Sequence, residues 1–225
     1  MRFSEVVREA AKPSWEKGLR HPFVMGIVNG NLPLDTFKFY ILQDIYYLKH
    51  FGKVHAMAAV QADDFRITAF LAEKAKTTAE AELTVHKQHA EALGITDEEM
   101  AQFKPAPTAY AYTSHMYRAA LSGRLSETIA ALLPCYWLYG EIGEINKEAQ
   151  PQEPLYANWI RTYASDWFQQ GVQEFVDLFD RLAEGASVAE KARMQEQFVI
   201  ATEWELAFWE MAYTKEKWPS EALLV

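Results

Sequence analysis

Two acidic side chains fall on helix faces that are otherwise apolar. Residues three and four positions apart share one face of a helix, and in residues 35–62 Asp44 is the charged member of such a face. The other members are aromatic or aliphatic: Phe37, Tyr40, Ile41, Tyr47, Leu48 and Phe51. We therefore expect Asp44 to point inward. A buried carboxylate loses hydration, so it must find a partner or take up a proton.

Glu205 occupies an equivalent position within residues 188–214. Its face consists of Phe198, Ala201, Thr202, Phe208, Trp209 and Ala212. Glu203 lies on a different face with Glu196 and Glu210, which indicates a solvated surface. For Asp44 and Glu205 alike the pattern leaves two interpretations open. Each is either a structural acid paired inside the core or a functional carboxyl group.

Cys135, the single cysteine, replaces an aliphatic residue on a third apolar face. A lone buried cysteine is most often a small apolar residue. Its setting favours a reactive thiol over a packing residue, because Pro134 precedes it and Tyr136 and Tyr139 can supply hydroxyl donors. A thiol with an ordinary pKa of about 8.5 needs such help to react as thiolate. Two inward acids, one thiol and several tyrosines suggest nucleophilic catalysis on a small planar ligand.

Two aromatic clusters could supply flat walls for such a ligand, although aromatic residues at helical spacing most often pack a core. One cluster consists of Tyr110, Tyr112, His115 and Met116, and the other of Trp159, Tyr163, Trp167 and Phe168. A metal site is a weaker hypothesis. Glu82, His86 and His89 could share one helix face, but polar neighbours favour a solvated face, and no second helix offers Glu-x-x-His. We expect no metal.

The elements that carry these residues are predicted to be helices only. No alternation typical of strands and no fixed-period repeat occurs, so the sequence predicts an all-α bundle in a single domain over residues 1–225. Caps, glycines and prolines place the helices at residues 4–17 (N-cap Ser4), 20–30, 35–62 (N-cap Asp35), 65–92, from 96 (capping box), 109–121, 126–148, 155–183 and 188–214.

Composition excludes several classes of protein. Half of the residues are hydrophobic and 14% are aromatic, which excludes a disordered chain. One cysteine excludes an internal disulfide. A formal charge of -9 argues against nucleic-acid binding. The first residues lack the apolar core of a signal peptide, and the apolar run at 129–140 is too short to span a membrane, so we expect a cytoplasmic protein.

Four runs of the sequence are distinctive: residues 40–54 (YILQDIYYLKHFGKV), 104–118 (KPAPTAYAYTSHMYR), 132–139 (LLPCYWLY) and 208–213 (FWEMAY). Together they resemble the TenA family of thiaminase II enzymes. The resemblance covers essentially the whole chain, and the sequence is similar to the bacillus-type branch that keeps the cysteine. It implies a heme-oxygenase-like helical fold without heme, a homotetramer, and hydrolysis of 4-amino-5-aminomethyl-2-methylpyrimidine to the 5-hydroxymethyl compound. Thiamin can be cleaved at the same methylene carbon, and the role is salvage of the pyrimidine half of degraded thiamin.

The resemblance also implies roles for individual residues. Cys135 matches the family nucleophile, Glu205 the proton donor, and Tyr47 the residue that makes the cysteine more nucleophilic. Asp44 matches a substrate-binding acid. The remaining matches are substrate-contacting tyrosines, Tyr139 and Tyr163, and stacking walls, Tyr112 and Phe208. No metal or organic cofactor is required. The alternatives are a regulatory protein that affects expression of extracellular enzymes and a metal- or heme-dependent oxidase on the same architecture.

Overall fold

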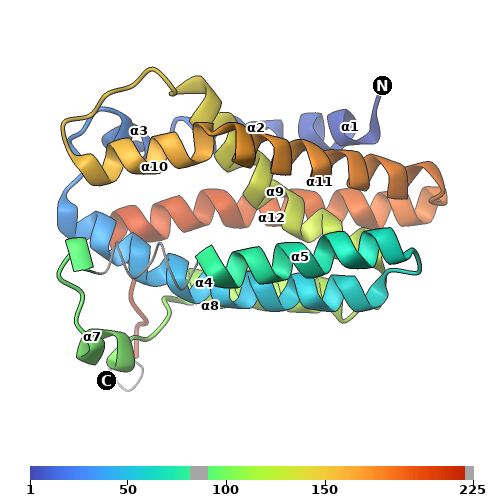
Figure 1. The fold of residues 1–225 in the computed structure, drawn as a ribbon, viewed down its shortest axis with the longest axis horizontal. Coiled ribbons are helices and arrows are strands. Elements are labelled where there is room, and N and C mark those ends of the chain that lie inside the picture. Colours follow the sequence, from blue (N-terminus) through green and yellow to red (C-terminus); the bar gives the residue numbers. More distant parts are fainter. Residues whose placement is uncertain (82–90, 221–225) are drawn as a thin grey trace. The chain divides into compact units, whose positions relative to one another are not determined.

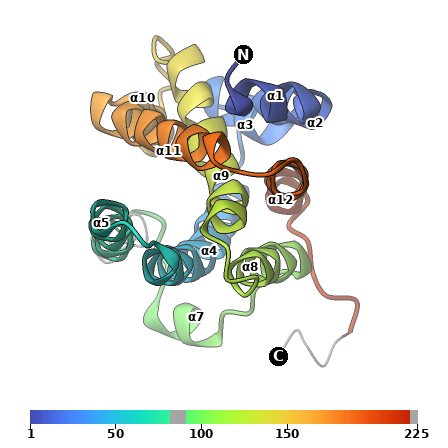
Figure 2. The same cartoon turned by 90° about the vertical axis from the view of Figure 1, so that its right-hand side faces the viewer.

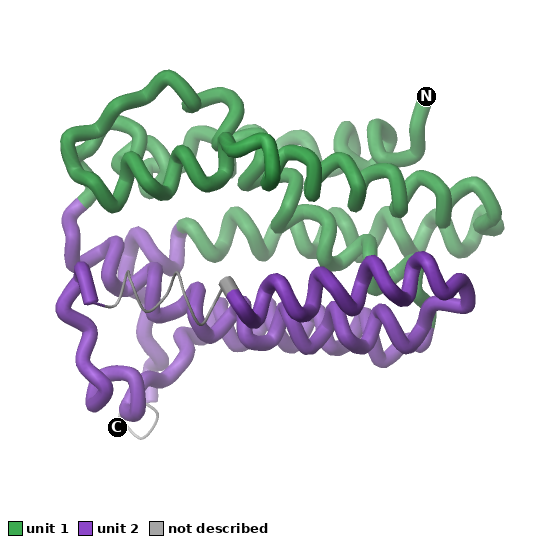
Figure 3. The backbone as a smooth tube through the Cα atoms, in the orientation of Figure 1, with its two compact units in different colours: residues 1–32, 124–209 green, residues 33–123, 210–225 purple. Residues whose placement is uncertain are grey.

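The computed structural model describes residues 1–81 and 91–220, and in these ranges all regular structure is helical (Figures 1 and 2). The prediction of an all-α protein is therefore confirmed. No helix within these ranges is long and apolar enough to cross a membrane. The chain forms two compact units, residues 1–32 with 124–209 and residues 33–123 with 210–225, which are coloured separately in Figure 3. The expectation of a single domain stays a prediction.

Unit 1 is built around one buried helix. Its elements are α1 (Phe3–Ala10), α2 (Lys12–Leu19), α3 (Pro22–Val28), α9 (Leu125–Ile145), α10 (Pro154–Ala164), α11 (Asp166–Glu184) and α12 (Val188–Thr214) as far as Trp209. Helix α9 packs against α10 and α11, with the rings of Tyr136 and Phe175 stacked at 4.3 Å. In the predicted apolar run at 129–140, all residues except Cys135, Tyr136 and Trp137 are buried, so this run belongs to a core helix as the sequence predicts.

Unit 2 consists of α4 (Leu34–Gln61), α5 (Phe65–Ala81), α7 (Asp97–Gln102), α8 (Pro107–Ala120) and the last turn of α12. Helix α4 packs against both α5 and α8. Two side-chain amides of α4 join it to the ends of α8. Gln43 accepts the Ala106 N–H at 2.9 Å, and Gln61 donates to the Ala120 carbonyl at 2.6 Å. The capping box of Thr96 and Glu99 at the start of α7 is confirmed.

Two predicted helices are each divided in two, and both divisions have a local cause. The first divides at Ala11, because Pro13 lacks an N–H and its ring crowds the preceding turn. The second divides at Ser165, whose backbone is extended and whose side chain accepts the Phe168 N–H as the N-cap of α11. The expectation of one helix over residues 155–183 was therefore wrong, because a serine can end one helix and begin the next.

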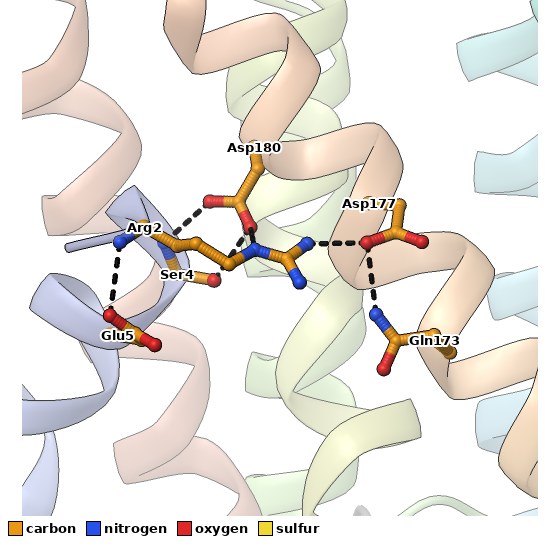
Figure 4. Close-up of polar contacts among 6 residues, drawn as sticks. All are labelled: Arg2, Ser4, Glu5, Gln173, Asp177 and Asp180. Carbon is orange, nitrogen blue, oxygen red and sulfur yellow. Dashed lines mark hydrogen bonds and ion pairs between the residues drawn. The ribbon is translucent and has the colours of Figure 1, made fainter.

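The first helix has Arg2 as its N-cap, not Ser4 as predicted, and its start is capped by two carboxylates: Glu5 of the same helix accepts the Arg2 N–H at 3.0 Å, and Asp180 comes from another helix. Asp180 of α11 accepts hydrogen bonds from the Ser4 N–H and the Ser4 hydroxyl, each at 2.7 Å, and from Nε of Arg2 at 2.6 Å (Figure 4). Arg2 also pairs with Asp177, to which Gln173 donates. Ser4 itself lies inside the helix and is buried. Asp35 is likewise inside its helix, since α4 begins at Leu34.

Candidate active site

Cys135 lies on α9 directly after Pro134. The proline has no N–H, so the backbone hydrogen-bond ladder of α9 lacks one donor at this point. The thiol is free of any disulfide and half-buried, between the fully buried residues before it and the more open face of Tyr136 and Trp137. A half-buried thiol can meet a ligand, whereas a fully buried one serves only packing.

Tyr139 lies one turn after Cys135 on the same face of α9. Its ring is 4.7 Å from the ring of Tyr163 on α10 and 4.9 Å from the ring of Trp209 on α12. Tyr163 in turn makes edge contacts with Trp159 at 4.8 Å and Phe168 at 4.9 Å. The aromatic cluster predicted around Tyr163 therefore exists and joins three helices to the Cys135 face of α9.

Trp167 is the exception within that cluster. Its side chain is 62% exposed, and its ring lies 6.3 Å from the ring of Phe168. The sequence could not separate Trp167 from Phe168, because the position of the α10–α11 break decides which of the two turns inward.

Glu205 and Phe208 lie on α12, and each is only 2% exposed. Glu203 is exposed and accepts the hydroxyl of Ser14 at 2.5 Å. The prediction that Glu205 points inward and Glu203 outward is confirmed. Since Glu205 precedes Trp209 by one turn, its carboxyl lies one turn before the contact between Trp209 and Tyr139.

Two contacts fix how α9 and α12 run beside each other. Arg193 donates to Glu127 at 2.6 Å near the start of both helices, and Trp209 meets Tyr139 further along both. The two helices therefore run in the same general direction between these contacts. Cys135 on α9 and Glu205 on α12 each precede the contact of Tyr139 with Trp209 by four residues, which is about one helical turn.

Asp44, Tyr47 and Tyr112 lie in unit 2. Asp44 is 8% exposed on α4, as predicted for an inward acid. Tyr47, one turn later, is buried, and its ring lies 4.9 Å from the ring of Tyr112 on α8. Unit 2 therefore brings together Tyr47 and Tyr112, with Asp44 on the adjoining turn of α4, whereas Cys135, Tyr139, Tyr163, Glu205 and Phe208 belong to unit 1.

Residues that could hold a metal do not gather in the described ranges. Across residues 1–81 and 91–220, no three His, Cys, Asp or Glu side chains are grouped as a metal ion requires. The candidate set of Glu82, His86 and His89 lies outside the described residues. The expectation of no metal stays a prediction.

Sequence reasoning missed the residues that hold Tyr163 in place. Gln169 of α11 donates from Nε2 to the carbonyls of Gly140 and Tyr163, both at 2.8 Å. Gly143 of α9 lies directly against the backbone of Tyr163. The signal that could have found them is the pair of glycines, Gly140 and Gly143, within an apolar helix, where glycine commonly marks a close approach.

Comparisons with known proteins identify similar sequences and similar folds. The model of the TENA/THI-4/PQQC family matches residues 8–215. A protein of Bacillus subtilis named aminopyrimidine aminohydrolase is 51% identical over 223 residues, covering 99% of this chain and 94% of that protein.

Two solved structures resemble the fold. A TenA homologue from P. horikoshii has a TM-score of 0.88 at 30% identity, covering 95% of this chain and 99% of the other. A domain of heme-oxygenase-like fold from Shewanella denitrificans has a TM-score of 0.72 at 13% identity, covering 94% and 92%. The predicted heme-oxygenase-like fold is therefore confirmed.

Proposed function

Because this chain belongs to the TENA/THI-4/PQQC family, we propose that it is an aminopyrimidine aminohydrolase, a thiaminase II that hydrolyses a carbon–nitrogen bond. The substrate is 4-amino-5-aminomethyl-2-methylpyrimidine, and thiamin is a second substrate cleaved at the same carbon. The observation that carries this proposal is the 51% identity, over 99% of the chain, to the Bacillus subtilis protein of that name.

Cys135 and Glu205 supply the nucleophile and the proton in this proposal. Glu205 donates a proton to a ring nitrogen, and the sulfur of Cys135 adds to a ring carbon. The bond between the methylene carbon and its amino group, which is protonated at neutral pH, then breaks, and ammonia leaves. Water adds to the methylene carbon and gives a proton to the released ammonia. The carbon–sulfur bond then breaks, the ring nitrogen returns its proton to Glu205, and the ring regains its aromaticity. The net change is one water consumed and one ammonia released.

The positions of Cys135 and Glu205, each one helical turn before the contact of Tyr139 with Trp209, support these two roles. The burial of Glu205 also supports them, because a proton donor shielded from water interacts more strongly with the charge that develops on the ring.

The other proposed residues bind and orient the ring. Asp44 accepts hydrogen bonds from the aminopyrimidine, and Tyr139 and Tyr163 contact the substrate. Tyr112 and Phe208 stack on the two faces of the ring. Tyr47 donates a hydrogen bond that favours the thiolate of Cys135. The clustering of Tyr139 with Tyr163 and of Tyr47 with Tyr112 supports these assignments.

The same proposal extends to the setting of the reaction. We infer that the enzyme works in the cytoplasm in salvage of the thiamin pyrimidine, as a homotetramer, without a cofactor and without binding nucleic acid. Light scattering tests the assembly. A tetramer has about four times the chain mass of 25.8 kDa, and a monomeric mass at micromolar concentration contradicts it.

Ammonia release is the direct test of the proposed function. The purified protein is assayed with the aminomethylpyrimidine and, side by side, with thiamin, whose cleavage is followed through the pyrimidine product. We expect turnover of the aminomethylpyrimidine and slower cleavage of thiamin. If the folded protein releases no ammonia from the aminomethylpyrimidine, the proposal is wrong. In that case specific binding to a promoter fragment at moderate salt supports the regulatory alternative.

A further inference from the structure

Gly143 allows α9 and α10 to meet backbone against backbone. A Cβ atom on Gly143 would lie 2.3 Å from the carbonyl carbon of Tyr163, 2.6 Å from its oxygen and 2.6 Å from the nitrogen of Ala164. Such distances are far inside van der Waals contact, and the obstructing atoms are main chain, which cannot turn aside as a side chain can. Any larger residue at position 143 must therefore move the end of α10.

Gln169 forms hydrogen bonds at the same end of α10. The last carbonyls of a helix have no partner within that helix. Tyr163 is the next-to-last residue of α10, and its carbonyl accepts Nε2 of Gln169 at 2.8 Å. The same nitrogen reaches the Gly140 carbonyl of α9, also at 2.8 Å. One amide from α11 thus joins α9 and α10 one turn away from Gly143.

The side chain of Tyr163 is positioned by these backbone contacts. Its half-buried ring meets the rings of Tyr139, Trp159 and Phe168 edge-on at 4.7, 4.8 and 4.9 Å. Tyr139 is one turn after Cys135 on α9. The distance between α10 and α9 therefore sets the position of the Tyr163 ring relative to the face of α9 that carries Cys135.

We propose that Gly143 and Gln169 are positioning residues that act through Tyr163 to set binding of the pyrimidine substrate. Neither one needs to touch substrate. The inference rests on the proposed function, in which Tyr163 contacts the ring. It adds that the close approach of α9 and α10 determines the position of that contact, and that residues outside the reacting groups therefore tune KM.

The first test is steady-state kinetics of Gly143→Ala and Gln169→Met. Gly185→Ala is the matched control, because a Cβ at Gly185 meets no atom within 4 Å and its φ is −87°. We expect Gly143→Ala to raise KM for the aminomethylpyrimidine about tenfold or more, with a smaller change in kcat, since displacing a binding group by about 1 Å can cost up to about 10²-fold. Gln169→Met should change KM in the same direction. Gly185→Ala should leave both constants unchanged.

A double-mutant cycle separates positioning from general loss of structure. If Gly143 acts through Tyr163, Gly143→Ala in a Tyr163→Ala background costs less than about twofold in kcat/KM. If the two losses multiply instead, or if Gly143→Ala and Gln169→Met both leave KM unchanged, the inference is wrong. If Gly143→Ala does not fold, the same double-mutant cycle is measured with Gln169→Met and Tyr163→Ala.

Amide hydrogen exchange keeps this inference distinct from the proposed function. In residues 154–164, exchange should be faster in Gly143→Ala than in wild type and unchanged in Gly185→Ala. If wild type lacks ammonia release while exchange responds as expected, the proposed function fails and the role of Gly143 in holding α10 stands. If exchange in residues 154–164 is unchanged, the positioning inference fails whatever the activity.

Discussion

At the scale of single residues, the sulfur of Cys135 is the atom on which covalent catalysis depends. Cys135→Ser replaces it with a hydroxyl that is a far weaker nucleophile at neutral pH. We expect ammonia release to fall below detection while the product pyrimidine still binds, as measured by calorimetry. Near-normal turnover in this variant would refute covalent catalysis. Loss of both turnover and product binding would instead indicate a damaged fold.

Glu205 gives a second prediction with an internal control. Glu205→Gln keeps the shape of the side chain but cannot deliver the proton, so kcat should fall about 10²–10⁴-fold. Glu203→Gln is the matched control, since Glu203 lies on the same helix two residues earlier and is exposed. The measurement is the pH–rate profile of both variants. Equal losses in the two variants, or an unchanged profile in Glu205→Gln, would place the proton elsewhere.

Inward acids were predictable from the sequence, whereas the residues that hold Tyr163 were not. Asp44 and Glu205 interrupt faces of otherwise apolar residues, and helical periodicity alone assigns them to the interior. Gly143 and Gln169 act through contacts between α9, α10 and α11. Such contacts depend on how helices pack, and no periodicity within one helix reveals them.

At the scale of elements, the segment after α12 completes the start of α8. Glu216 accepts the Thr108 N–H at 2.9 Å, and Trp218 donates to the Pro105 carbonyl at 2.8 Å. The N-cap of α8 is Ala106, which has no side-chain acceptor of its own. A carboxylate more than 100 residues away in the chain thus takes the place of a local cap.

Removing that distant cap should destabilise unit 2. We expect Glu216→Ala to lower the free energy of unfolding by about 1 kcal/mol, the usual effect of losing an N-cap acceptor, and Glu216→Gln, which keeps an oxygen in place, to lower it by less. Urea unfolding followed by circular dichroism measures both. If Glu216→Ala and wild type have the same midpoint, the bond to Thr108 contributes nothing to stability.

Element boundaries were predictable where the signal was local. Thr96 and Glu99 form the expected capping box because both partners lie within one turn. The start of α1 was mispredicted because Ser4 is a residue type that commonly caps helices, whereas the observed N-cap is Arg2, with Glu5 and the distant Asp180 as the acceptors. The break at Ser165 was missed because serine is tolerated inside helices as well as at their ends.

At the scale of the whole molecule, one buried histidine makes stability depend on pH. His55 on α4 is fully buried and donates from Nδ1 to the Phe51 carbonyl at 2.8 Å. Burial lowers its pKa to about 4, a shift that the nearby positive charge of Lys74 reinforces. Between pH 6.5 and 4 the unfolded chain therefore takes up a proton at His55 that the folded chain does not. Stability must fall as the pH falls through this window.

The size of that effect follows from the two pKa values. Relative to pH 8, the free energy of unfolding should be lower by about 2 kcal/mol at pH 5 and by about 3 kcal/mol at pH 4, with little further loss from this group below pH 4. His55→Gln removes the titration, so the difference in unfolding free energy between variant and wild type should shrink as the pH is lowered from 8 to 5. His50→Gln is the comparison, because His50 is only partly buried and should account for a smaller part of the slope. If wild type and His55→Gln lose stability in parallel between pH 8 and pH 5, the buried ring of His55 is not the group that titrates.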